Sequence, residues 1–191
     1  LGFKRSKGGQ EWKKKINDVI IRRVQFNFNL NEKERWIGII PTLNVWHKNI
    51  QELKVSAGIL DQRYYKDSAT VALILNNLCG EKSYNYNLGT NPEGIVDELT
   101  SDISKFGLPV FTNLENLDWI LKNLSSNNPK EWCVPSASDR ARLIPLILYI
   151  KGRYGEGLRA IKQLKDGLVT RDQIIPDINH FEKWFLKLNH N

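Results

Sequence analysis

The sequence contains no methionine, only two cysteines and only three histidines in 191 residues. Cys79 and Cys133 do not form a Cys-x-x-Cys pair and have no histidine beside them, so they lack the spacing of a zinc site. Two isolated cysteines favour free thiols, with a disulfide as the alternative, and we expect a reducing, cytoplasmic setting. His47, His180 and His190 lie far apart. We therefore expect no metal and no cofactor.

Long hydrophobic runs and catalytic motifs are also lacking. The longest apolar run, residues 143–150, is too short to cross a bilayer and contains Pro145. No Gly-x-Ser-x-Gly elbow is present, and the segment KGGQE (7–11) lacks the Gly-Lys-Ser/Thr that completes a phosphate loop. The segment GRYGEG (152–157) follows a predicted helix rather than a strand, which disfavours nucleotide binding there. We predict no catalytic residue, and the hypothesis that the protein is an enzyme is less favoured.

Positive charge is concentrated at one end of the chain. The net charge is +7, and residues 1–35 hold ten basic and four acidic residues, an excess of six. Such a basic region can attract an acidic protein, nucleic acid or anionic lipid. Alternatively it is only the solvated edge of a sheet, since lysine commonly protects edge strands from pairing.

The first half of the chain predicts an antiparallel sheet. Apolar residues at 24, 26, 28 and 30 alternate with polar residues at 23, 25, 27 and 29, so this strand should bury one face and expose the other to solvent. We predict further strands over 11–16, 36–46, 53–57, 70–75 and 84–88. Pro41 implies an edge, a bulge or a break in its strand. The almost wholly apolar run 70–75 suggests a strand buried on both faces, with a short helix as the alternative.

The second half predicts helices. A helix should begin at residues 90–93 and bury Ile95, Val96, Leu99, Ile103 and Phe106. Gly107, in a left-handed conformation, and Pro109 should end it, and a capping box over 112–115 should start the next helix after a sharp corner. Later helices are expected over 138–154, from 158 to Gly167, and over 177–188. The fold class is therefore α+β: one domain over residues 1–191, sheet-rich over 1–90 and helical over 91–191, with four to six strands packed against the helices.

Several short segments resemble a known bacterial family. They are the opening LGFKR (1–5), the tryptophan-bearing strands, YNYNL (84–88) before a helix, and GLPVF (107–111). Together they are similar to the domain-of-unknown-function family number 4304, over about residues 1–165. Tyr84 and Tyr86 stand where that family has tryptophans. The resemblance implies an α+β fold and a bacterial cytosolic setting, and it implies no activity, cofactor or catalytic residue.

One surface stands out as a candidate contact for a partner. Lys13, Lys15 and Arg23 are expected on the wet face of the sheet near Trp12, where they could meet phosphates or carboxylates. Phe26 and Phe28 lie on the same face of the predicted strand as Val24. They should therefore be core residues rather than a surface on which nucleic-acid bases stack. We also expect Asp97, Glu98 and Asp102 to be solvated, His47 to lie at the surface or in a turn, and Cys133 to be a packed thiol.

These features favour a non-catalytic protein-binding module, with an acidic protein as its partner and a bacterial stress, competition or immunity role. Nucleic-acid binding through the basic sheet face is the first alternative, and an enzyme with an unrecognised site is the second. No membrane association is expected, and the protein should be a monomer or a homodimer.

Overall fold

The computed structural model describes residues 2–6, 9–128, 131, 133–134, 136–167 and 175–188. The chain packs as two compact units, Leu1–Trp46 with Val71–Asn116, and His47–Thr70 with Leu117–Asn191. We call them the sheet unit and the helical unit. Their architecture confirms the α+β class, with an antiparallel sheet early in the chain and helices mostly in its second half. The single domain predicted for residues 1–191 stays a prediction.

The described residues of the sheet unit form six strands: β1 (Lys4–Arg5), β2 (Glu11–Lys15), β3 (Ile20–Asn31), β4 (Trp36–His47), β5 (Val71–Ile74) and β6 (Tyr84–Asn87). They run in the order β1-β2-β3-β4-β5, and β6 also pairs with β4. Strand β4 pairs with β6 along residues 36–39 and with β5 along residues 42–45. Pro41 falls between these two ladders, where its missing N–H costs no hydrogen bond to either strand. The predicted edge or break is therefore absent, and β4 runs unbroken through the centre of the sheet.

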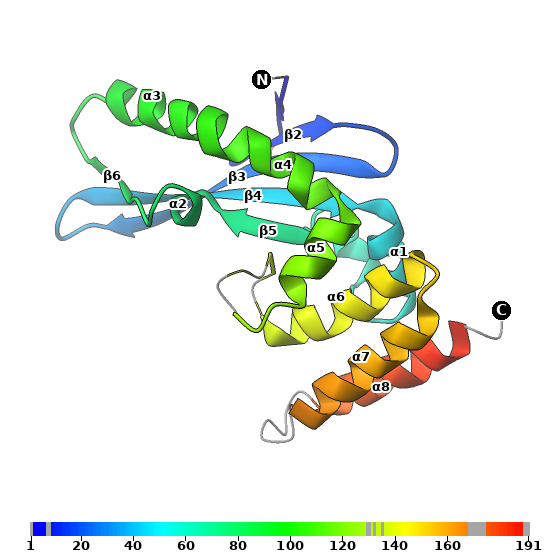
Figure 1. Ribbon diagram of the computed structural model, residues 1–191. Helices are drawn as coiled ribbons and strands as arrows, with labels where there is room; N and C mark the ends of the chain where they lie inside the picture. Colours follow the sequence, from blue (N-terminus) through cyan, green and yellow to red (C-terminus); the bar gives the residue numbers. More distant parts are fainter. Residues whose placement is uncertain are drawn as a thin grey trace. The chain divides into compact units, whose positions relative to one another are not determined.

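Helices α3 (Glu93–Asp102) and α4 (Leu108–Glu115) form one continuous run over the sheet (Figure 1). The predicted corner at Gly107 is wrong: a π-helical turn, Ile103–Gly107, joins the two helices, and Gly107 has an ordinary helical φ of −75°. A Cβ on Gly107 would lie 3.3 Å from both methyl carbons of Leu43, so glycine lets the helix approach β4 closely. The wider π turn also accommodates Pro109, which cannot donate a backbone hydrogen bond.

The predicted capping box also proved wrong. Residues 112–115 lie inside α4, the break falls at Asn116, and the next helix, α5 (Leu117–Leu124), belongs to the helical unit. Glu115 instead pairs with Arg22 of β3, whose Nη2 donates to Oε2 over 3.1 Å. The same guanidinium lies 5.5 Å from the centre of the buried Phe111 ring. This contact fastens α4 to the sheet.

The helical unit contains α1 (Lys48–Ser56), a 3₁₀ turn (Gln62–Tyr64), α5, α6 (Ala137–Ile150), α7 (Tyr154–Gly167) and α8 (Ile175–Lys187). Helix α1 replaces the strand predicted over 53–57, and its inward side buries Ile50 and Gln51. Ser136 caps α6 by accepting the N–H of Asp139 over 3.1 Å. Pro145 lies in the interior of α6, and the helix ends before Gly152, which has a φ of +71°. Helices α7 and α8 run side by side in opposite directions (Figure 1).

The sheet is less deeply buried than its alternating sequence predicted. Val24 is 4% exposed, as expected, but Phe28 and Leu30 at the far end of β3 are 50% and 57% exposed. Strand β5 buries Val71 and leaves Ile74 exposed, so it is not covered on both faces as predicted. The core of the sheet unit lies nearer β4, around residues such as Leu43, Val45, Tyr84, Phe111 and Leu114.

Candidate functional site

The predicted basic surface is divided between the two faces of the sheet. Lys13 and Arg23 are directly opposed across β2 and β3, and Lys15 shares their face. Trp12 belongs to the opposite face, where it meets the Phe26 ring edge-on at 5.1 Å. Because neighbouring residues of a strand point to opposite sides, a phosphate bound at Lys13 could not also bring a base onto Trp12. The structure therefore does not bring Trp12 together with the other three residues.

The three basic residues on that face lie next to acidic side chains of the same unit. Lys13 Nζ lies 2.8 Å from Glu11 Oε2, and Lys15 Nζ lies 2.6 Å from Asp18 Oδ1. Arg23 is only 1% exposed, with its Nη1 3.6 Å from Glu11 Oε1. The prediction that Arg23 is exposed to solvent is therefore wrong. Pairing across the strands reduces the positive charge that the face presents.

An apolar groove lies on the other face of the sheet, under α3. Its volume is about 510 Å³, within the range of ligand-binding clefts. Its lining is mostly apolar and comes from the N-terminal segment, β2, β3, β4 and the helical run: Gly2, Phe3, Trp12, Val24, Phe26, Phe28, Ile39, Val96, Leu99, Thr100 and Ile103. We call this the aromatic groove.

The walls of the aromatic groove are open to solvent. Phe28 on the β3 wall is 50% exposed, and Val96 on the α3 wall is 54% exposed. Both had been predicted as core residues. Apolar side chains that line a hollow and stay half-exposed mark a surface where a partner can bury them. The alternating pattern of β3 identified this apolar face, but the sequence did not show that α3 leaves the end of it uncovered.

Basic side chains lie at the Gly2 and Trp12 end of the groove. The Arg5 guanidinium lies 5.9 Å from the centre of the Trp12 ring. The ammonium nitrogen of Lys14 comes within 3.4 Å of the position that a Cβ on Gly2 would take. Gly2 has a φ of +71°, which favours glycine at this close approach. The groove therefore combines an apolar floor with positive charge at one end.

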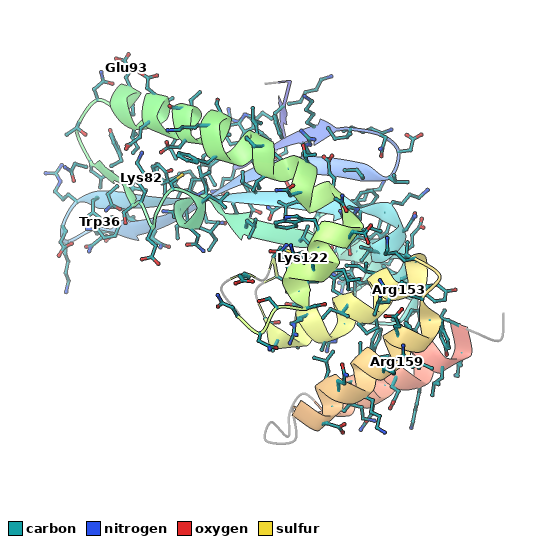
Figure 2. All side chains as sticks on the ribbon, in the orientation of Figure 1. Trp36, Lys82, Glu93, Lys122, Arg153 and Arg159 are labelled. Carbon is teal, nitrogen blue, oxygen red and sulfur yellow. The ribbon has the colours of Figure 1, made fainter. Side chains whose placement is uncertain are left out.

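A buried polar network that the sequence analysis missed joins α3 to the β6 region. Tyr84 is 1% exposed, and its hydroxyl donates to Asp102 over 2.9 Å. Lys82 pairs with the same carboxylate and, over 2.8 Å, with Glu98. Lys82 lies beside α2 (Leu75–Leu78) and β6 (Figure 2). Asp102 is 8% exposed, so its predicted solvation is wrong. Its position between Leu99 and Ile103 on the helix was the available signal.

The electrostatics of this network favour one protonation state. The hydrogen bond from Lys82 is the main reason that the pKa of Asp102 lies below its ordinary value. Burial, together with the neighbouring Cys79 and Asp102, raises the pKa of the Tyr84 hydroxyl. At neutral pH the carboxylate stays charged and the phenol stays protonated, so neither group is suited to accept a proton from a substrate. The network holds β6 and α3 together through the hydrogen bond from Tyr84 to Asp102.

The cysteines and histidines, which were the remaining candidates for nucleophiles or metal ligands, do not cluster in the described part of the chain. Both cysteines are free thiols; Cys133 is fully buried, and burial raises its pKa to about 12. His47 was expected at the surface or in a turn; it is only 6% exposed, so the surface position is wrong, and it lies where β4 ends and α1 begins. His180 is exposed on α8, and His190 lies outside the described residues. Within the described ranges, no group of three or more His, Cys, Asp or Glu side chains could hold a metal ion.

No helix in the described part of the chain is both long and apolar enough to span a bilayer. Comparison of the chain with family models, with curated proteins and with solved structures found no match. The resemblance to the domain-of-unknown-function family stays a prediction.

Proposed function

We propose that this chain is a non-catalytic binding module, and that its aromatic groove takes an amphipathic, acidic segment of a partner protein. The observation that carries the proposal is the groove itself: a hollow of about 510 Å³ with an almost wholly apolar lining and two half-exposed apolar walls. A helix that lays its apolar face in a groove is a common mode of peptide recognition. The apolar contacts would supply most of the binding free energy.

Charge complementarity favours an acidic partner over a basic one. Arg5 and Lys14 lie at one end of the groove, and residues 1–35 carry an excess of six positive charges. Such a surface speeds the encounter with an acidic segment and disfavours a basic one. A cytoplasmic, bacterial setting and a role in stress, competition or immunity remain part of this proposal.

The structure favours this proposal over nucleic-acid binding through Lys13, Lys15, Arg23 and Trp12. That alternative needs phosphate contacts and a stacking ring on one accessible face. Arg23 is buried, Lys13 and Lys15 lie within ion-pair distance of carboxylates, and Trp12 lies on the other face. The exposed aliphatic wall of α3, which includes Val96, offers neither a phosphate contact nor a stacking ring. A protein partner uses both the apolar walls and the basic end.

Two synthetic helical peptides of about 18 residues would test the proposal. Both carry the same stripe of leucines, and their polar positions are glutamate in one and lysine in the other. We expect the glutamate peptide to bind and the lysine peptide to bind at least about tenfold more weakly, measured by titration calorimetry. Amide chemical shifts should change around Phe28 and Val96.

A pair of matched variants locates the binding surface. Phe28→Ser removes a half-exposed aromatic wall and should weaken the glutamate peptide by about tenfold or more, since a buried phenyl ring contributes about 1.5–3 kcal/mol. Tyr64→Ser removes an aromatic residue of similar exposure, 56%, from the helical unit and should leave binding unchanged. Equal binding of the two peptides, or equal effects of the two variants, would contradict the proposal.

A further inference from the structure

The helical unit contains a second hollow, of about 530 Å³, between the end of α5, α6 and α7. It is independent of the aromatic groove, because all its lining residues belong to residues 117–191. Its floor is aliphatic and includes Leu121, Ile144 and Leu148, whereas its rim is polar. We call it the arginine groove, because three arginines line it.

The three arginines come from different places along the helices. Arg140 lies near the start of α6, Arg153 lies at the turn between α6 and α7, and Arg159 lies on α7 (Figure 2 labels the last two). Helical spacing places Glu156, Arg159 and Gln163 on one face of α7, since they follow at three- and four-residue steps. One carboxylate and three guanidinium groups leave the lining with two excess positive charges.

Two of the guanidinium groups are held in place. Arg153 donates to both carboxylate oxygens of Glu156, from Nε to Oε1 over 2.7 Å and from Nη2 to Oε2 over 2.6 Å. Arg140 donates its Nε–H to the Leu124 carbonyl at the end of α5. A guanidinium has five N–H donors in a fixed fork, so each of these contacts orients the group. Such preorganised forks bind an anion with little further loss of conformational entropy.

Arg159 is the arginine that an incoming anion would engage most directly. Among the described residues no carboxylate forms an ion pair with it, although it lies near enough to Glu156 to help lower the pKa of that carboxyl group. Its side chain is exposed on the wall of the groove. A cation at the rim of a hollow, beside two fixed guanidinium groups, repels them until an anion binds between them.

We propose that the arginine groove binds the phosphomonoester of a small organic molecule. The two excess positive charges match a phosphomonoester, which carries about −1.5 to −2 at neutral pH and offers three acceptor oxygens. Guanidinium forks fit phosphate oxygens, and Gln163 supplies a neutral donor on the same wall. The aliphatic floor takes the organic part, and the volume suits one small molecule.

Naphthyl phosphate is a suitable probe, with naphthol and inorganic phosphate as its two halves. We expect naphthyl phosphate to bind at least about tenfold more tightly than either half, in titrations at about pH 7.5 and constant ionic strength. Equal affinity for naphthol would show that the guanidinium groups contribute nothing, and would overturn the proposal. Tighter binding of a phosphoserine peptide would overturn the small-molecule assignment.

Two substitutions in the groove should act in opposite directions. Arg159→Gln removes one charge-assisted donor and should weaken naphthyl phosphate about tenfold. Glu156→Gln removes the one carboxylate among the described lining residues, while its amide oxygen can still accept a hydrogen bond from Arg153, so it should strengthen binding several-fold. Arg63→Gln, on the 3₁₀ turn and paired with Asp61, is the matched control and should change nothing. A loss of binding in Glu156→Gln, or none in Arg159→Gln, would contradict the proposed site.

Discussion

Gly157 gives the sharpest test of how the helical unit is packed, because α7 passes both α6 and α8 at this residue. A Cβ on Gly157 would lie 2.8 Å from Cζ and 3.2 Å from Cε1 of Phe185, and 3.4 Å from the carbonyl oxygen of Pro145. Phe185 is fully buried, and its ring stacks on Tyr154 at 5.2 Å with an interplanar angle of 1°. The ring therefore has no free space into which it could swing.

The expected magnitude follows from two opposing effects. Alanine is a better helix former than glycine by about 1 kcal/mol, partly because glycine leaves the unfolded chain more freedom. Forcing a methyl group into a filled core costs about 1–3 kcal/mol. Gly157→Ala should therefore destabilise the helical unit by up to about 2 kcal/mol. Gly155→Ala, where a Cβ meets nothing within 4 Å, should stabilise it by up to about 1 kcal/mol.

Urea unfolding followed by far-ultraviolet circular dichroism measures both free energies of unfolding. The two glycines lie two residues apart in the same helix, so the difference between the two variants reflects the contacts of the added methyl group with Phe185 and Pro145. In a Phe185→Leu background, which shortens the crowding side chain, Gly157→Ala should cost less than it does in the wild type. If Gly157→Ala stabilised the protein as much as Gly155→Ala, the close packing of α7 against α8 would be wrong.

The buried network and the buried thiol give three further predictions. The pKa of Asp102 is lowered in the folded protein, so the ionised carboxylate stabilises the fold above the ordinary carboxyl pKa of about 4. This stabilisation is lost as the pH falls through the pKa that Asp102 has in the folded protein. The wild type should therefore lose more stability in acid than Asp102→Asn, which urea unfolding midpoints measured at a series of pH values would show. Tyr84→Phe should cost about 1.5 kcal/mol, and Tyr86→Phe, whose hydroxyl donates to the neutral Thr90 carbonyl at the surface, should cost less in the same unfolding assay. Cys133, with its pKa raised to about 12, should react with a thiol reagent at about pH 8 only as fast as the protein opens, and rapid labelling in the native state would contradict its burial.

Features set by neighbouring residues in the sequence could be predicted well. The strand around residues 23–30 and the strand 84–88 were confirmed as strands, because a period of two is a local property of a strand, but burial along β3 does not alternate. The helix ending at Gly167 and the last helix also follow local periodicity and were found within a few residues of their predicted bounds. The segment 53–57 failed because five residues with a β-branched valine suit a strand or one turn and a half of helix equally well.

Features set by distant residues could not be predicted. Gly107 resembles a helix end in sequence, but its role is to let the helical run approach Leu43 on β4. Arg23 lies on the face of the sheet that its periodicity indicated, yet it is buried, because burial also depends on what covers a face. Phe28 shows the reverse case, an apolar residue of correct parity on which no other element lies closely enough to exclude water.

The two candidate grooves show why charge along the sequence is a poor guide to an anion site. The run Lys13, Lys14, Lys15 is the densest basic stretch near the predicted surface, but the strand places Lys14 on one face and its neighbours on the other, next to Glu11 and Asp18. Arg140, Arg153 and Arg159 span twenty residues and form no basic run. Helical spacing and the turn at Gly152 bring them to one hollow. If the Arg159→Gln and Glu156→Gln variants behave as expected, convergence of side chains in space, rather than local charge density, locates the anion-binding surface.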